Sequence, residues 1–404
     1  MGSKVYSAGE LIDYSIGGGW GKEEPQGDHQ CEVAIIRGAD FPSIEQGSYN
    51  KLPIRWEKKV KATKAALRPG DIVLEISGGT DDRPTGRTLY ITSELLDSYK
   101  CPIIPASFCR LLRPVNSISS AYLFFWLQDM YNKGRTWGYQ NRSTGLSNFQ
   151  YKVFAELEQV VIPGKETQHA IASLLLMLEE KRHLNNRTND YLAAMCDAVF
   201  SEQFGGIEDN AVLSDVADIT MGQSPSGKSY NEDGGGTVFY QGRGEFGWRY
   251  PTQRLFTTEP KRMAKEGDVL MSVRAPVGDL NVAYEDCCIG RGLAAIHSQY
   301  PSYCLYLMRS LGKKLDAYNG EGTVFGSING KALNGLKVGL PDVDAIKTFE
   351  AFAHPIDLQI RSNVTEERCL ATMRDALLPK LMSGEIDVSH VELPTQPNNH
   401  LSVG

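Results

Sequence analysis

The sequence contains no long apolar run. No window approaches 18 consecutive apolar residues, and the first ten residues, MGSKVYSAGE, lack the apolar core of a signal peptide. These absences argue against a membrane-spanning or secreted protein, and we expect a cytoplasmic location. The 404 residues, of which 41% are hydrophobic and 23% charged, are enough for two or three folded domains.

Metal-binding and disulfide patterns are also missing. The eight cysteines form no CxxC pair, and the seven histidines form no HxH or HExxH motif. Zinc sites and disulfide frameworks need such regular spacings. We therefore expect no bound metal, and cysteines that serve mostly as small buried hydrophobic residues.

Catalytic signatures are scarce: the chain has no GxSxG elbow and no NPP[YF] tetrapeptide of adenine methyltransferases. Residues 222–229, GQSPSGKS, match the phosphate-loop pattern GxxxxGK[ST]. The following SYNEDGGGTVFY has three glycines and no helical period, whereas a phosphate loop requires a helix there. We expect a chain that is not an enzyme by itself. A nucleotide-dependent enzyme that uses residues 222–229 is an alternative.

The net charge of −7 is unevenly distributed. Residues 165–210 and 342–404 together hold 18 acidic against 9 basic residues, whereas residues 1–164 and 211–341 each carry one net positive charge. The acidic average therefore does not exclude nucleic-acid binding by local basic surfaces.

The two acidic segments repeat each other. Residues 168–206 align without a gap with residues 346–384, and apolar residues recur at heptad steps in both copies. Asn185 and Asn363 interrupt the heptads at the same place, and a polar residue at such a position fixes the register of paired helices. A solvent-facing asparagine on a core helix is the alternative. The repeat predicts two long antiparallel helices on which these asparagines face each other.

The second helix differs from the first by two prolines. Pro355 and Pro379 should kink or interrupt it, because proline lacks the backbone donor and its ring clashes with the preceding turn. We expect the regular part of this helix to cover residues 356–378.

The globular segments repeat more loosely. LRPGDIVLEISGG from Leu67 matches AKEGDVLMSVRAP from Ala264, a turn followed by a buried strand in each copy. We predict an α+β fold in which two similar mixed α/β domains are separated by two long antiparallel helices, with a pseudo-twofold relation. The predicted boundaries are 1–164 for the first domain, 165–204 for the first helix, 205–210 for a linker, 211–341 for the second domain, 342–384 for the second helix and 385–404 for a flexible tail.

Polar loops in both domains combine basic and amide side chains with aromatic rings. Arg and Lys suit phosphate contacts, and Arg, Gln and Asn can read base edges. For any single residue, a solvated surface or a structural turn is an equally good interpretation. The DNA-binding candidates in the first domain are Trp20, Lys22, Arg37, Arg83, Arg87, Arg135, Tyr139, Gln140, Asn141 and Arg142. Those in the second domain are Gln223, Ser226, Lys228, Tyr230, Gln241, Arg243, Trp248, Arg249, Arg274 and Arg291.

With this layout, the segments MGQSPSGKSY, FYQGRGEF, GDVLMSVRAPVGD, IGRGLAAI and ALLPKLMSGEIDV resemble the specificity subunits of type I restriction-modification systems. The resemblance extends from about Tyr6 to Val388 and is clearer in the second half. The first half shares the layout and GGGWGKE, but its ISGGTDDRPTGR departs from the SVRAP pattern.

The resemblance implies two target-recognition domains that read the halves of a split, asymmetric sequence in double-stranded DNA. It also implies that the paired helices act as a ruler and dock two methyltransferase subunits, with restriction subunits joining through them. Adenine-N6 methylation with S-adenosylmethionine, and DNA cleavage driven by ATP with magnesium in phage defence, would belong to those partners, so no cofactor is expected in this chain. The competing hypothesis is a coiled-coil scaffold that never touches DNA.

Overall fold

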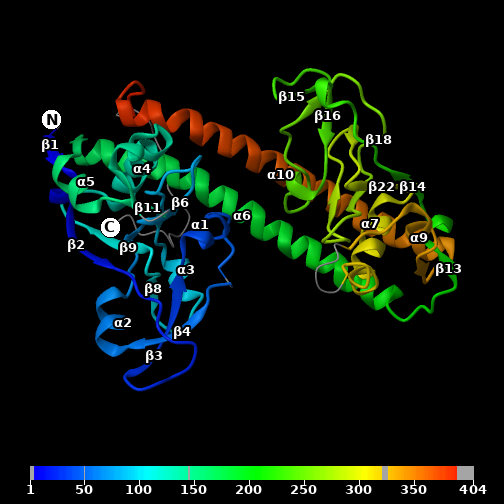
Figure 1. The fold of residues 1–404 in the computed structure, drawn as a ribbon, viewed down its shortest axis with the longest axis horizontal. Helices are drawn as coiled ribbons and strands as arrows, with labels where there is room; N and C mark the ends of the chain where they lie inside the picture. Colours follow the sequence, from blue (N-terminus) through cyan, green and yellow to red (C-terminus); the bar gives the residue numbers. More distant parts are fainter. Residues whose placement is uncertain (1–3, 50, 144–145, 321–325, 389–404) are drawn as a thin grey trace. The chain divides into compact units, whose positions relative to one another are not determined.

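The computed structural model describes residues 4–49, 51–143, 146–320 and 326–388, without the side chains of residues 142–146. They form two compact units (Figure 1). Unit 1 comprises the described residues up to 188 and from 363 on, and unit 2 comprises those between 189 and 362. Each unit combines sheets with helices, so the predicted α+β class is confirmed. The predicted tail lies outside the described residues from 389 on.

Unit 1 holds four small sheets and five short helices. The sheets, in strand order, are β2 (Ile12–Gly17), β9 (Cys109–Pro114), β5 (Ile72–Glu75) and β7 (Thr88–Tyr90); β4 (Ile54–Lys58), β3 (His29–Ile36) and β8 (Ile103–Pro105); β10 (Gln140–Ser143), β11 (Leu146–Phe149) and β6 (Ser77–Gly79); and β1 (Lys4–Ser7) with β12 (Gln159–Ile162). The helices are α1 (Phe41–Glu45), α2 (Lys59–Ala65), α3 (Ser93–Asp97), α4 (Ser120–Asn132) and α5 (Tyr151–Leu157).

Unit 2 holds three sheets and three short helices in its described residues. The sheets, in strand order, are β14 (Asp218–Met221), β22 (Leu293–His297), β19 (Val269–Ser272) and β20 (Leu280–Val282); β15 (Tyr230–Asn231), β17 (Phe256–Thr257), β16 (Thr237–Tyr240), β21 (Cys287–Ile289) and β18 (Met263–Ala264); and β13 (Ala211–Val212) with β23 (Lys337–Val338). The helices are α7 (Pro301–Ser310), α8 (Gly312–Asp316) and α9 (Gly330–Asn334).

The two units repeat one strand order. The antiparallel sheet β2-β9-β5-β7 of unit 1 corresponds to β14-β22-β19-β20 of unit 2, which is also antiparallel throughout. The parallel pair β3-β8 corresponds to β16-β21, and the antiparallel pair β1-β12 corresponds to β13-β23. The loose sequence repeat therefore reflects two similar folds. Their buried central strands, IVLE in β5 and VLMS in β19, lie at matching places in that repeat.

The two long helices, α6 (Lys165–Phe204) and α10 (Val343–Ser383), contribute to both units. In unit 1, Ile171 and Leu175 of α6 and Leu378 and Leu381 of α10 are buried in one cluster with the apolar residues of α4. Helices of this kind bury one apolar stripe and expose the rest. None of the helices in the described part of the chain has the length and apolar character that a membrane span requires.

The second long helix corrects the expectation drawn from its prolines. α10 runs through Pro355 and Pro379 without a break, so the predicted regular part, 356–378, was too short. A proline inside a helix costs about 3 kcal/mol because it removes a hydrogen bond and crowds the preceding turn. Burial of Phe349 and Ile360 in unit 2, and of Leu378 in unit 1, offsets this cost on both sides of the prolines.

An aromatic cluster joins α6, α7 and α10 in unit 2. The rings of Phe200 and Phe204 lie 5.3 and 5.6 Å from that of Phe349, both edge to face, and the ring of Tyr303 lies 5.7 Å from that of Phe200. Edge-to-face pairs are favoured because the positive edge of one ring meets the negative face of the other. The cluster therefore fixes the two long helices against α7.

We predict that Phe349→Ala lowers the free energy of unfolding of unit 2 by about 3 to 5 kcal/mol, because it leaves a cavity among three rings. Urea denaturation followed by tyrosine and tryptophan fluorescence measures this change. The matched control is Phe352→Ala on the same helix, whose ring is 37% exposed and whose removal should cost much less. Equal losses for both variants would contradict the packing described.

Candidate nucleic-acid interface

Several loops of unit 1 meet at one edge of its main sheet. β2 and β5 end there and β9 begins there: Gly18 N donates to Cys109 O at 2.9 Å, and Ile76 N donates to Phe108 O at 2.8 Å. Phe149 N, next to the β10–β11 hairpin, donates to Ile76 O at 2.8 Å. We call the described residues gathered there the loop edge of unit 1; they are 18–22, 37–40, 76–87, 106–108, 140–143 and 146–149.

A buried carboxylate organises this edge. Glu75, 3% exposed at the end of β5, accepts from Arg83 Nη1 at 3.0 Å and from Arg87 Nε and Nη2 at 2.9 and 2.7 Å. The same arginines donate to backbone carbonyls, Arg83 to Gly78 and Arg87 to Gly38. One carboxylate thus ties together the end of β5, the 78–87 loop and the 37–40 turn. Two of the predicted DNA contacts are engaged inside the protein.

The other candidates of unit 1 fall into two groups, and the first group lies at the loop edge. Arg37 pairs with Asp40 at 2.6 Å, and Gln140 Oε1 accepts from Thr85 N at 2.6 Å, so both belong to the loop edge. Trp20 is partly exposed, with the Arg55 guanidinium 5.0 Å from its ring. Two more candidates lie at this edge: Lys22, whose backbone pairs with that of Trp56, and Asn141, whose side chain is exposed. The side chain of Arg142 lies outside the described residues.

Arg135 and Tyr139 form the second group, and their side chains are bound to Glu158. Both hold Glu158: Arg135 forms an ion pair with its carboxylate, and Tyr139 Oη donates to it at 2.7 Å. The Glu158 carbonyl in turn accepts from Ala8 N, which precedes β2 and so lies toward the other end of the sheet. These contacts bind both residues to Glu158 within the fold, whereas the sequence analysis predicted that both contact DNA.

Unit 2 builds the same edge on the corresponding strands. Gly222 N donates to Leu293 O at 2.9 Å, and Val273 N donates to Gly292 O at 2.9 Å, as Gly18 and Ile76 do in unit 1. Four predicted contacts have exposed side chains at this edge: Gln223, Gln241, Arg274 and Arg291.

The remaining candidates of unit 2 differ in access. Arg249 is only 4% exposed, pairs with Asp357 at 3.0 Å and lies between the rings of Trp248 and Tyr306, so its guanidinium is inside the fold. Arg243 forms an ion pair with Asp279. Trp248 is exposed. Ser226 and Lys228 are exposed in the loop after β14, and Tyr230 Oη donates to Pro225 O at 3.1 Å.

Residues 222–229 do not form a phosphate loop. The second glycine of the motif begins a three-residue 3-10 helix, Gly227–Ser229, and the chain then enters β15. A phosphate loop needs the N-terminus of a regular helix at this point. The motif is therefore part of the loop edge of unit 2 rather than a nucleotide site.

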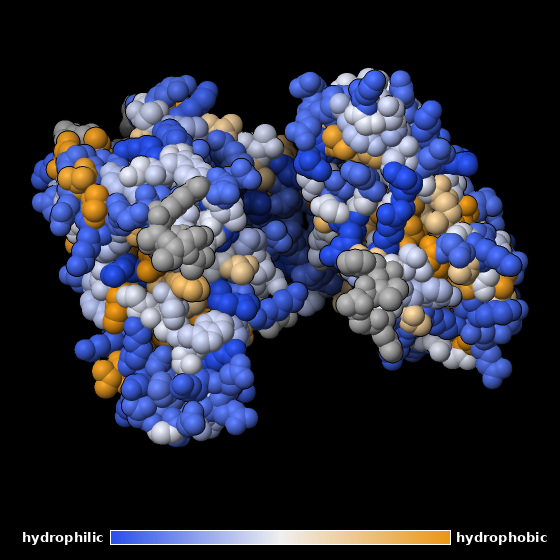
Figure 2. Space-filling model, viewed as in Figure 1, coloured by the Kyte–Doolittle hydropathy of each residue, from blue (hydrophilic) through white to orange (hydrophobic). Residues whose placement is uncertain are grey.

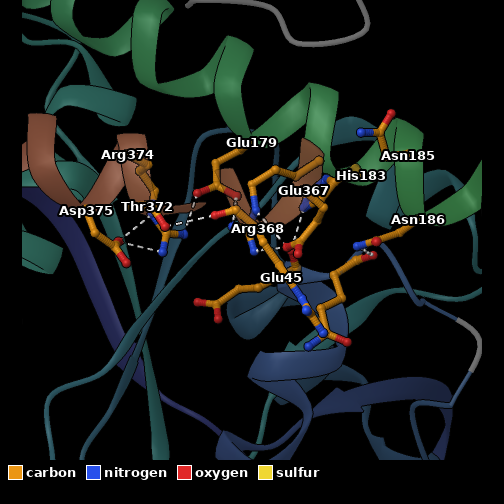
Figure 3. Close-up of polar contacts among 12 residues, drawn as sticks. Glu45, Glu179, His183, Asn185, Asn186, Glu367, Arg368, Thr372, Arg374 and Asp375 are labelled. Atoms are coloured by element: carbon orange, nitrogen blue, oxygen red, sulfur yellow. Dashed lines mark hydrogen bonds and ion pairs between the residues drawn. The ribbon is translucent and has the colours of Figure 1, made fainter. Parts of the chain in front are cut away.

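Polar contacts line the seam between α6 and α10 in unit 1 (Figure 3). Asn185 and Asn363 are both buried and meet: Asn185 Nδ2 lies 3.4 Å from Asn363 O and donates to Glu366 at 2.8 Å. Arg182 pairs with Glu367, and Glu179 pairs with Arg374. From Asn185 back to Glu179 on α6, the partners on α10 run forward from Asn363 to Arg374, so the two helices are antiparallel here.

Glu45 of α1 lies near this seam (Figure 3). It lines a pocket of about 400 Å³ together with Phe124 of α4 and Leu176 and Glu179 of α6. Although the residue is exposed to the pocket mouth, protein atoms crowd its carboxylate. This desolvation, with repulsion from Glu179, raises the pKa of Glu45 to about 7. His183 Nε2 lies 2.6 Å from the Glu45 carbonyl, which ties α1 to α6.

Sequence reasoning missed Glu75. The signal was available, because a carboxylate at the end of an apolar strand must find cations, and arginines follow 8 and 12 residues later. That reasoning assigned both arginines to DNA and left the acid unexplained.

Two copies of one α+β unit that share a pair of long helices define the class of protein. A protein with the name "Putative type I restriction enzyme MjaX specificity subunit", from Methanocaldococcus jannaschii, is 30% identical over 303 residues, which are 69% of this chain and 71% of that protein. The chain therefore belongs to the specificity subunits of type I restriction enzymes, which are not catalytic by themselves. Among protein-family models, none matches.

One solved structure agrees on the fold, and a second is similar over nearly the whole chain at a low TM-score. The S subunit of a type I restriction-modification system from M. genitalium has a TM-score of 0.56 at 16% identity, covering 94% of this chain and 96% of that one. The HsdS subunit from Thermoanaerobacter tengcongensis covers 95% of this chain and 97% of its own, at 22% identity and a TM-score of 0.35.

We predict that Glu75→Gln lowers the free energy of unfolding of unit 1 by about 3 kcal/mol, because it leaves two arginines facing a neutral group. Chemical denaturation measures the loss. The control is Glu94→Gln, which removes a half-exposed partner of Arg187 and should change little. Equal effects would mean that Glu75 does not organise the loop edge.

We also predict that Glu45→Gln stabilises unit 1 at pH 8 and leaves it unchanged at pH 4. A carboxyl whose pKa is about 7 in the folded chain, against an ordinary value of 4.5, costs stability as the pH rises between those values. Glutamine avoids that cost because it stays neutral. Urea midpoints at the two pH values measure the effect, and a gain of the same size at both would refute it.

Proposed function

We propose that this chain reads a bipartite, asymmetric sequence in double-stranded DNA, with unit 1 contacting one half and unit 2 the other. It docks two methyltransferase subunits, and through them the restriction subunits of the system. One observation carries the proposal: the two units bring polar and basic loops to the same edge of one repeated sheet, with different side chains at corresponding places.

A shared scaffold with different loops suits a split target. Base edges are read by side chains, whereas phosphate contacts only position the protein. Unit 2 offers Arg274 and Arg291 as exposed cations at its loop edge, and unit 1 offers Asn141 and Gln140 beside arginines held by Glu75. Two such edges would recognise different half-sites, which makes the target asymmetric.

The long helices suit a protein partner better than DNA. Their sequence segments carry the acidic excess of the chain, which repels phosphates. They also expose large apolar side chains, Leu184 and Met373 in unit 1 and Tyr191 and Met195 in unit 2. Elsewhere the drawn surface is largely hydrophilic with scattered apolar patches (Figure 2). Exposed apolar residues on a long helix mark a surface for another protein.

The chemistry of the system belongs to the partners in this proposal. A methyltransferase subunit would flip the target adenine out of the duplex, because its N6 atom is otherwise stacked and paired, and would transfer the methyl group from S-adenosylmethionine. ATP and magnesium would serve the restriction subunits. The chain itself would act in the cytoplasm, where the DNA is.

We predict salt-dependent, sequence-specific DNA binding by the complex with its methyltransferase subunits. Mapping methylated adenines in cells that express the complex identifies the target, and fluorescence anisotropy then measures Kd on that duplex between 50 and 200 mM salt. With 6 to 10 phosphate contacts, affinity should fall by about 10³ to 10⁵-fold over this range. Arg274→Ala and Arg291→Ala should each weaken binding about 10-fold.

The control variant is Arg309→Ala on α7, which removes an exposed arginine paired with Asp197 away from the loop edge. It should bind DNA like the unaltered complex. A scaffold that never touches DNA would cause no change in the anisotropy of the duplex at any salt concentration, and this outcome would overturn the proposed function.

A further inference from the structure

An exposed phenyl ring lies on the loop edge of unit 1. Phe108, in the turn between β8 and β9, is 59% exposed, more than the tryptophans at positions 20, 137 and 248. The flanking Ala106 and Cys109 are buried. The turn therefore holds its backbone inside the fold and directs one apolar side chain to the surface.

The turn that carries this ring is fixed by its neighbours. The Phe108 carbonyl accepts from Ile76 N at 2.8 Å and from Ser77 N at 3.2 Å. Cys109 N donates to Ala106 O, and Ala106 N donates to Ile36 O, each at 2.8 Å. A ring on such a turn loses little conformational freedom when it binds, so its burial contributes more to affinity than burial of a mobile side chain would.

The turn that carries the ring is also bonded to segments whose side chains suit nucleic acid. The hydrogen bonds of the turn lead directly to Ser77 on β6 and, through Ile36, to the 37–40 turn that carries Arg37. Ser77 bonds in turn to Asn148 of the β10–β11 hairpin. The turn that carries the ring is thus bonded to segments that bear hydroxyl, amide and guanidinium groups, the set that binds phosphates and base edges.

The internal repeat identifies this turn as a position that differs between the units. Gly18 N bonds to Cys109 O as Gly222 N bonds to Leu293 O, and Ala106 N bonds to Ile36 O as Gly290 N bonds to Tyr240 O. Phe108 therefore corresponds to Gly292, and the residue before it, Ser107, corresponds to Arg291. At neighbouring positions of the shared backbone, unit 2 presents a cation, Arg291, and unit 1 presents a ring, Phe108.

We propose that the Phe108 ring inserts against the base stack of the half-site that unit 1 reads, at a base step that opens when the complex binds. This inference rests on the proposed function. Phenylalanine rings act as wedges between base steps in proteins that deform DNA, because the ring replaces the stacking that the bases lose. A glycine at the matching position leaves unit 2 without a wedge, so the step should open in one half-site only.

The test uses the complete complex with its methyltransferase subunits and duplexes of the mapped target. 2-Aminopurine replaces one base at a time through both half-sites, and its fluorescence rises where stacking is lost. Apart from the signals at the flipped adenines of the two half-sites, the complex should produce one further bright step in the half-site of unit 1. Phe108→Ala should abolish that further signal and weaken binding about 10-fold. Phe108→Trp should keep both the signal and the affinity.

Leu157→Ala is the matched control, because it removes an apolar side chain of similar exposure beyond the opposite end of the sheet, next to Glu158. Thermal unfolding of each variant shows whether it folds, and Phe108→Trp gives a second test if the alanine variant does not. The wedge is overturned if Phe108→Ala binds DNA and gives the same fluorescence pattern as Leu157→Ala. Absence of specific binding by the unaltered complex is a different result, which overturns the proposed function and this inference with it.

Discussion

Burial of the two long helices is the constraint on which both units depend. In unit 1 the apolar stripe of α6 and the end of α10 complete the core that α4 begins. In unit 2 the other ends of the same helices supply Phe200, Phe204 and Phe349 to the aromatic cluster. The cores of both units therefore include residues of these two helices. This shared burial explains why α10 continues through two prolines that would end an isolated helix.

The repeated sheet shows which features are common to the two units, the strand order and backbone hydrogen bonds, and which differ, the side chains of the loops. Strand order and the backbone hydrogen bonds at the loop edge recur in both units, down to the contact between the end of the first strand and the start of the partner strand. Side chains at that edge do not recur. Backbone contacts carry the fold and tolerate loop substitutions, so a duplicated unit of this kind can acquire two recognition surfaces without refolding.

The sequence predicted the helices and the repeat well because both depend on local patterns. Heptad steps mark a buried stripe, and the asparagine at the same place in each copy predicted the pair that Asn185 and Asn363 form. The effect of Pro355 could not be predicted locally, because the burial that offsets its cost comes from residues distant in sequence. The candidate site was harder still. Whether an arginine faces solvent or a carboxylate is decided by tertiary contacts, as Arg87 with Glu75 and Arg249 with Asp357 show.

Those internal ion pairs change how charge at the two edges should be counted. In unit 1, Arg37, Arg83 and Arg87 are paired with Asp40 and Glu75, which leaves one net positive charge of the three, so these arginines contribute rigidity more than free positive charge. A buried pair of this kind resists exchange for a phosphate, because leaving the carboxylate alone in a low dielectric costs several kcal/mol. In unit 2, Arg274 and Arg291 are exposed at the edge. If the proposed function holds, the two similar folds would therefore contact DNA through different forces, unit 1 through shape and apolar contact and unit 2 through charge.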